Sequence, residues 1–131
     1  MSTIQVTFPG GRRVDAAFDG HVVHTDQSPA HGGEGSAPEP FDLFLTSLAT
    51  CAGIYVLGFC QARAISTEGI RLTQESTFEE GKLREVKLAI DLPASFPEKY
   101  VNAVRAAAAG CRVKKVLADP PSITVDVIRP T

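Results

Sequence analysis

The pattern of apolar and polar residues near the amino terminus predicts three short strands. Apolar residues alternate with polar ones at residues 4–8 and again at 14–18, on either side of the break "PGG". A period of two is typical of half-buried strands, and the glycines between the runs indicate a turn. The segment "HVVHT", residues 21–25, continues the pattern. We therefore expect a hairpin followed by a third strand.

A loop and a long apolar helix follow. The segment "DQSPAHGGEGSAPEP", residues 26–40, is too rich in Gly, Pro and Ser for regular structure, and we interpret it as a flexible loop, with the rim of a site as the alternative. Pro40 suits the first turn of a helix because its missing N–H would be unpaired there. The charge of Asp42 suits the helix dipole. The predicted helix extends to about Ala64.

This predicted helix is apolar around nearly its whole circumference. One stripe has the spacing of a helix face, while Leu43, Ile54 and Leu57 lie off it. Such a helix must be buried on more than one side. A chain of 131 residues cannot bury it under its own sheet alone, so we predict that a second subunit covers the remaining face. The stripe consists of Phe41, Phe44, Leu45, Leu48, Ala52, Tyr55, Val56 and Phe59.

The second half of the chain predicts a hairpin, a helix, a helical turn and a last strand. Two strands are predicted on either side of Glu80-Gly81, and the second alternates cleanly at Val86, Leu88 and Ile90. A helix then has Ser95 as its candidate cap, Pro97 and Glu98 in its first turn and Gly110 at its end. After the helical turn "RVKKVLA", alternation at residues 123–127 predicts a strand. The order of elements indicates an α+β fold with helices against antiparallel sheets.

Length, composition and charge limit the number of domains and the classes of partner that we expect. The length and the even spread of apolar residues favour a single domain, residues 1–131. With 13 basic and 15 acidic residues scattered along the chain, nothing indicates binding to nucleic acid or to a membrane surface. The amino terminus lacks the features of a secretory signal, and polar residues interrupt the apolar run, so we expect a cytoplasmic protein.

The three cysteines, an odd number without an export signal, make a disulfide framework improbable and leave reactive or inert thiols as the alternatives. Cys51 and Cys60 fall on opposite faces of one helix, about 13 Å apart along its axis, and cannot bridge each other. Cys111 precedes three basic residues, a setting that lowers a thiol pKa. For Cys60 we favour the role of a small hydrophobe.

The histidines do not predict a metal site. His21 and His24 point to opposite faces of a strand, and His31 lies in the glycine loop. No zinc-ligand motif is present in the sequence, and "HGGEGS" lacks the spacing of a phosphate-binding loop. We expect no metal and no other cofactor.

Two cysteine contexts together resemble a known family. The segment "APEPFDLFLTSLATCAG" and the later "GCRVKKVL" are similar to those of the OsmC/Ohr family, osmotically inducible and organic hydroperoxide resistance proteins, as is the order of elements. The resemblance implies an intertwined α+β homodimer with active sites at the subunit interface. It also implies a thiol peroxidase of the oxidative stress response. In that reaction Cys51 would attack an organic hydroperoxide, or hydrogen peroxide, Cys111 would resolve the sulfenic acid, and an external dithiol would reduce the disulfide.

The resemblance also implies an activating arginine and an acidic residue that holds it. The arginine follows Gly-Gly in the first hairpin, which points to Arg12, with Arg13 as its neighbour and alternative. The acidic residue is expected ten positions before the first cysteine, where this chain has Phe41; Glu39 and Asp42 are the nearest acids. We expect Phe41, Phe44 and Tyr55 to contribute to an apolar substrate pocket.

A second hypothesis remains open beside the peroxidase. The chain is then a dimeric protein that binds a small apolar or thiol-reactive ligand without efficient turnover. A peroxidase requires Cys51 and Cys111 to be close enough to bridge, or to lie on a segment that can move, and it requires a reactive Cys51 thiolate. A binding protein requires neither.

Overall fold

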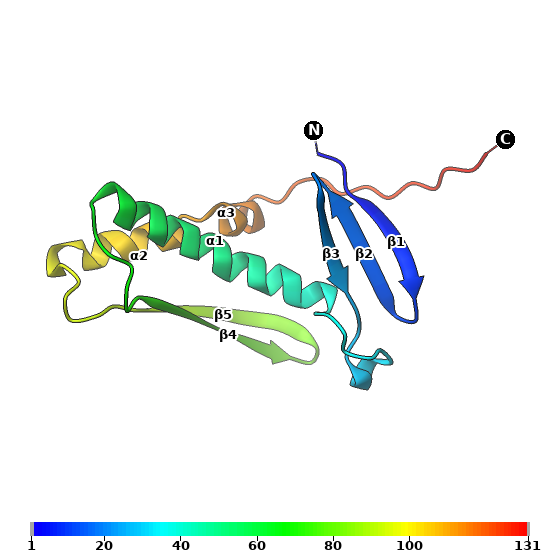
Figure 1. The fold of residues 1–131 in the computed structure, drawn as a ribbon, viewed down its shortest axis with the longest axis horizontal. Helices are drawn as coiled ribbons and strands as arrows, with labels where there is room; N and C mark the ends of the chain where they lie inside the picture. Colours follow the sequence, from blue (N-terminus) through cyan, green and yellow to red (C-terminus); the bar gives the residue numbers. More distant parts are fainter. Residues whose placement is uncertain (1, 131) are drawn as a thin grey trace. The chain divides into compact units, whose positions relative to one another are not determined.

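The computed structural model describes residues 2–130 and divides the chain into two compact units (Figure 1). The first unit ends at Ser47 and the second begins at Leu48, so the boundary lies within the long helix α1, Pro40–Ala62. Antiparallel strands and three α-helices make up the fold, which confirms the predicted α+β class.

The first unit contains a three-stranded antiparallel sheet in the order β1-β2-β3. Its strands are β1 (Gln5–Gly10), β2 (Arg13–Phe18) and β3 (His21–Thr25), as the alternation predicts. Val6 pairs with Ala16, which pairs with Val23, so these three side chains share one face of the sheet. A single turn of 3-10 helix, Pro29–His31, interrupts the loop that follows β3.

Helix α1 begins and ends close to the predicted residues. Asp42 Oδ2 accepts the N–H of Glu39 at 3.1 Å, which is the reciprocal half of a capping box, and the predicted place of Asp42 in the first turn is confirmed. The helix ends at Ala62, and Ala64 has a φ of 54°, outside the helical region.

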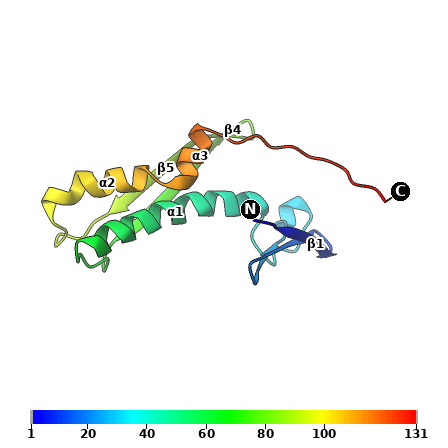
Figure 2. The same cartoon turned by 90° about the horizontal axis from the view of Figure 1, so that it is seen from above.

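The second unit packs most of α1 against a hairpin and two shorter helices (Figure 2). Its strands are β4 (Arg71–Glu79) and β5 (Lys82–Asp91), its 3-10 turn is η2 (Glu98–Tyr100), and its helices are α2 (Val101–Ala109) and α3 (Arg112–Ala118). The core consists of α1 and α2 side chains with Phe96, and partly buried sheet residues pack against it. Its buried members are Ala52, Val56, Cys60, Phe96, Val104 and Ala108.

Two predictions for this unit are wrong. Ser95 does not cap a helix, because the η2 turn starts after Pro97 and α2 follows it directly. No strand forms over residues 123–127. The chain from Pro120 to Pro130 has no regular structure, and Ile123, Val125 and Val127 are 84–91% exposed. A strand requires a neighbouring strand for its hydrogen bonds, and none of the strands described within residues 2–130 pairs with this segment.

The single chain buries only one side of α1. Ala52, Val56 and Cys60 are buried, whereas Ile54 is 58% and Tyr55 39% exposed. Length and composition alone would let α1 cross a membrane, but the core helix of a soluble protein passes the same test, and α1 contributes three of the buried core residues. The other side of α1 is the face for which the sequence predicts a second subunit.

Candidate functional site

Cys51 is a half-buried free thiol on α1, in the second unit. Leu48 and Ala52, three residues before it and one after it, line a cavity of about 410 Å³. Helical geometry places residues three apart on neighbouring positions of one face. Cys51 is therefore next to the wall of this cavity along the helix.

Cys111 lies at the start of α3, as the sequence predicts. Gly110 ends α2, where its N–H donates to the carbonyls of Ala106 and Ala107. Cys111 is then the N-cap of α3, with its Sγ accepting the N–H of Lys114 at 3.4 Å. The residue is 1% exposed and is a free thiol. A sulfur acceptor satisfies one of the unpaired N–H groups of the helix terminus.

The cavity of about 410 Å³ is lined by Cys111 of α3 and by Leu48 and Ala52 of α1, but not by Cys51 itself. Its walls are mainly apolar, and two cationic residues, Arg105 of α2 and Lys114 of α3, also contribute to them. Pockets of this size and character bind small organic molecules. The lining residues are Leu48, Ala52, Gln74, Val86, Leu88, Ile90, Arg105, Ala108, Ala109, Cys111, Lys114 and Leu117.

The aromatic residues expected in the substrate pocket do not line this cavity. Phe41 contacts Phe44 with the two rings tilted and their centroids 5.4 Å apart, and Phe41 is 49% exposed. Tyr55 lines a separate groove on α1 together with Ile54 and Gly58. Apart from Leu48 and Ala52 of α1, the cavity walls come from β4, β5, α2 and α3. The periodicity of α1 does not predict where these elements lie along it.

Cys60 belongs to the core cluster, whereas Cys51 is half-buried and Cys111, although also buried, lies in the wall of the cavity of about 410 Å³. Cys60 is fully buried in the core, and burial raises its pKa, with Arg63 acting in the opposite direction. A buried neutral thiol is a poor nucleophile. These surroundings fit the interpretation of Cys60 as a packing residue.

The two candidate arginines of the first hairpin have different surroundings. Arg13 folds back on its own turn, where its Nε donates to the Gly10 carbonyl at 3.3 Å. Arg12 lies against the loop after β3: a methyl group on Gly32 would be 3.5 Å from Arg12 Nε and 3.7 Å from Nη2. A small cavity of about 120 Å³ is enclosed here by Gly11, Arg12, Arg13, Asp26, Gly32, Gly33 and Glu34.

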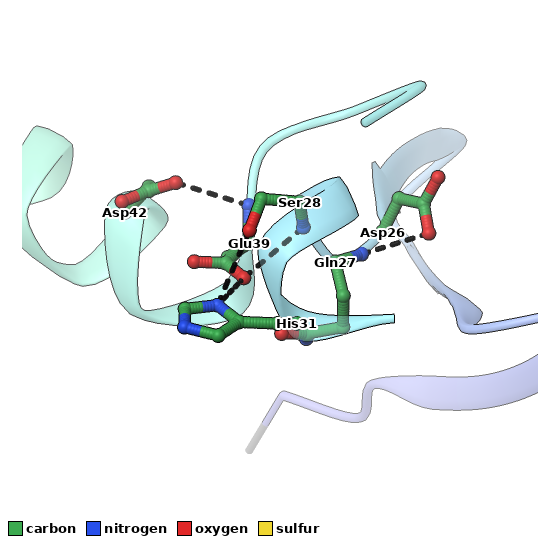
Figure 3. A network of polar contacts seen from close by, with 6 residues as sticks. All are labelled: Asp26, Gln27, Ser28, His31, Glu39 and Asp42. Atoms are coloured by element: carbon green, nitrogen blue, oxygen red, sulfur yellow. Dashed lines mark hydrogen bonds and ion pairs between the residues drawn. The ribbon is translucent and has the colours of Figure 1, made fainter. Parts of the chain in front are cut away.

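Hydrogen bonds to two carboxylates, Asp26 and Glu39, hold the loop after β3 (Figure 3). The sequence alone predicts a flexible loop. Asp26 accepts from the N–H of Gln27 at 2.7 Å (Figure 3). It also accepts from the N–H and the hydroxyl of Ser36, at 3.0 and 2.7 Å. These bonds, that of the Ser36 hydroxyl first, lower the pKa of Asp26 to about 2. The periodicity of apolar residues does not predict such bonds. The sequence feature that points to them is an acidic residue directly after a strand and before a glycine-rich loop.

Glu39 is the second carboxylate of the loop. It accepts from His31 Nδ1 at 2.5 Å and from the N–H of Ser28 at 3.2 Å. The bond to His31, followed by that to Ser28, lowers the pKa of Glu39. Within residues 2–130, Glu39 thus pairs with His31, and Asp42 caps α1. In the described part of the single chain, these partners are His31 and a backbone N–H, not Arg12.

The predicted catalytic residues are divided between the two units. Arg12 belongs to the first unit, with its loop, whereas Cys51 and Cys111 belong to the second. Among the described residues, no group of three or more His, Cys, Asp or Glu side chains could hold a metal ion. His24 instead pairs with Asp15 at 3.0 Å.

Comparisons with known proteins show what the chain is similar to. The family model described as OsmC-like protein matches residues 33–126. A proposed osmotic stress induced and detoxification response protein from Psychrobacter arcticus 273-4 is 27% identical, with a TM-score of 0.72 over 88% of this chain and 87% of that chain. A search of curated protein sequences finds no match.

Two further solved structures support the fold. An OsmC like protein from Mycoplasma pneumoniae is 16% identical, with a TM-score of 0.73 over 92% of this chain and 89% of that chain. An organic hydroperoxide resistance protein OsmC from Legionella pneumophila is 19% identical, with a TM-score of 0.59 over 89% of this chain and 88% of that chain. At such low identity these two likenesses establish the fold alone.

Proposed function

Because the chain belongs to the OsmC family, as the match over residues 33–126 shows, we propose that it is a thiol peroxidase that reduces organic hydroperoxides. The observation that carries the proposal is the apolar cavity, which Cys111 shares with the α1 residues on both sides of Cys51. A relative from Legionella pneumophila is called an organic hydroperoxide resistance protein, which supports the same substrate class.

The proposed reaction has two steps on the protein. The Cys51 thiolate attacks the distal oxygen of the hydroperoxide, the O–O bond breaks, and the alkoxide leaves and takes a proton to become the alcohol. Cys51 is then a sulfenic acid. The Cys111 thiol attacks its sulfur, a disulfide forms, and water leaves. An external dithiol reduces the disulfide, in the cytoplasm where we expect the protein to act.

Arg12 has the activating role in this proposal. A thiolate is the reactive form of cysteine, and a neighbouring guanidinium stabilises it. Arg12 is favoured over Arg13 because the Arg13 side chain is already hydrogen-bonded to its own turn through the Gly10 carbonyl.

The partner in this proposal is a second copy of the chain. Ile54, Tyr55 and Gly58 of α1 line an open groove of about 400 Å³ together with Phe59 and Ala107. Exposed apolar surface of this kind marks an interaction site. A homodimer would cover it with an equivalent apolar surface.

The test follows the thiols of reduced protein mixed with cumene hydroperoxide or hydrogen peroxide. The chain has three free cysteines, of which we expect two to be lost rapidly in the wild type and in the matched control Cys60→Ser. Cys111→Ser should lose one thiol and gain the mass of one oxygen atom. Cys51→Ser should react slowly if at all.

A slow oxidation that is the same with and without Cys51 would exclude the peroxidase. The same cavity favours the second candidate function, the binding of a small apolar ligand, because its walls are mainly apolar. In that case we expect an apolar fluorescent probe to bind wild type and Cys51→Ser equally.

A further inference from the structure

Asp26 is the most buried ionisable carboxylate in the described chain, at 1% exposed. Each of its side-chain oxygens is in use: Oδ1 accepts from Gln27, and Oδ2 accepts twice from Ser36. Its own N–H donates to the Pro38 carbonyl at 3.1 Å. One residue therefore ties together both ends of the loop, because Gln27 and Ser36 are nine positions apart.

The loop that Asp26 closes is packed without spare room. A methyl group on Gly33 would lie 2.1 Å from the Gln27 carbonyl oxygen and 2.7 Å from Asp26 Oδ1. Gly32 has a φ of 88° and Gly35 a φ of 66°, which are conformations that favour glycine. Two turn bonds add to the closure, from Gly33 N–H to the Ser28 carbonyl and from Gly35 N–H to the Gln27 carbonyl. The position of Gly32 is thus fixed by Asp26 and its partners.

Arg12 is the neighbour of this fixed backbone. Its guanidinium lies beside Gly32, and Arg12, Asp26 and Gly32 enclose the same cavity of about 120 Å³. An arginine side chain has several rotatable bonds, and holding it in one geometry costs conformational entropy. A rigid wall against the guanidinium reduces that cost in advance.

We propose that Asp26 is a positioning residue for Arg12: it closes the loop 26–36, and the closed loop holds the guanidinium in place through Gly32. This role rests on the proposed function, in which Arg12 stabilises the Cys51 thiolate. A small displacement of an activating group lowers a rate strongly, by about tenfold or more.

The first test observes Arg12 directly, without peroxide. The Arg12 Nε–H signal is assigned in an NMR spectrum by its loss in Arg12→Lys, and its order parameter is measured in three variants. Asp26→Asn and Ser36→Ala should lower that order. Asp15→Asn, the matched control in the same sheet, should leave it unchanged, because Asp15 pairs with His24. Equal Arg12 order in wild type, Asp26→Asn and Ser36→Ala overturns the proposal.

The second test asks whether Asp26 acts through Arg12. Asp26→Asn should slow the oxidation of Cys51 by cumene hydroperoxide about tenfold or more, with Ser36→Ala between it and the wild type. In the Arg12→Lys background the same substitution should have no further effect, because the group that Asp26 positions is gone. An effect of the same size in both backgrounds overturns the proposal.

The two tests separate this proposal from the proposed function. If wild-type Cys51 does not react with peroxide, the peroxidase is excluded, and the order of the Arg12 guanidinium alone decides the positioning role. If Asp26→Asn does not fold, the milder Ser36→Ala decides it, since that variant keeps the carboxylate and the bonds from both N–H groups.

Discussion

At the scale of single residues, the loop after β3 depends on ionised carboxylates. Asp26 and Glu39 both accept hydrogen bonds in their charged forms, and both have lowered pKa values, that of Asp26 being about 2. A group whose pKa is lower in the folded chain stabilises that chain when it is ionised. Its contribution is complete above the pKa of the unfolded chain and is lost as the pH falls through the folded pKa.

Asp26→Asn should therefore make the free energy of unfolding depend less on pH in the acid range. In the wild type, the contribution of Asp26 is complete above about pH 4 and is lost between about pH 4 and pH 2. The variant lacks this contribution at neutral pH and loses less on acidification, although the slope from Glu39 remains. Urea unfolding midpoints at neutral pH and across the acid range measure this. Asp126→Asn, in the exposed tail, should keep the wild-type slope; the same slope in Asp26→Asn would contradict the assignment.

At the scale of elements, the turn between β4 and β5 holds one residue in a backbone conformation that its residue type disfavours. Glu80 and Gly81 both have positive φ, 51° and 76°, as a type I′ turn requires. Glycine adopts this conformation readily and asparagine tolerates it, whereas glutamate does so at a cost.

Glu80→Asn should therefore raise the free energy of unfolding by roughly 0.5 kcal/mol, because it removes backbone strain from the turn. Glu80→Gln is the matched control: it also removes the charge but has no preference for positive φ. Urea denaturation of both variants measures the difference. Equal stabilisation by the two substitutions would assign the effect to charge and not to the turn.

Val104 of α2 packs in the core together with side chains of α1, so shortening it would leave a cavity. Val104 is 1% exposed in the core, whereas Val116 of α3 is 44% exposed. Val104→Ala should lower the free energy of unfolding by about 2 kcal/mol through lost burial and the residual cavity. Val116→Ala, the same chemical change at an exposed site, should cost less than about 0.5 kcal/mol. Similar losses in both variants would contradict this account of the core.

The elements were predictable where neighbouring residues determine them. Alternation and glycine turns predict both hairpins, and Pro40 with Asp42 predicts the start of α1. The strand at residues 123–127 was wrong because alternation describes a segment suited to pairing, but not whether a neighbouring strand is present. The Asp26 network was missed because its bonds join residues up to ten positions apart through an irregular backbone.

At the scale of the whole molecule, two apolar surfaces of the single chain are exposed to solvent. Ile54 and Tyr55 mark the open side of α1, and Ile123, Val125 and Val127 mark the carboxyl-terminal segment. In an extended segment, alternate residues share one side, so these last three would present a continuous apolar edge. An unpaired segment of this pattern adds readily to the edge of another sheet. A second copy supplies both surfaces at once, which supports the proposed homodimer.

The last prediction concerns this segment in the proposed dimer. Light scattering should give twice the chain mass of 13.9 kDa, and Val125→Asp should weaken the dimer at least about tenfold, because it places a charge on the apolar side. Thr124→Asp adds the same charge one residue away on the opposite side and should leave the dimer intact. Equal weakening by both substitutions would assign the effect to net charge, and a wild type of 13.9 kDa at every concentration would exclude the dimer.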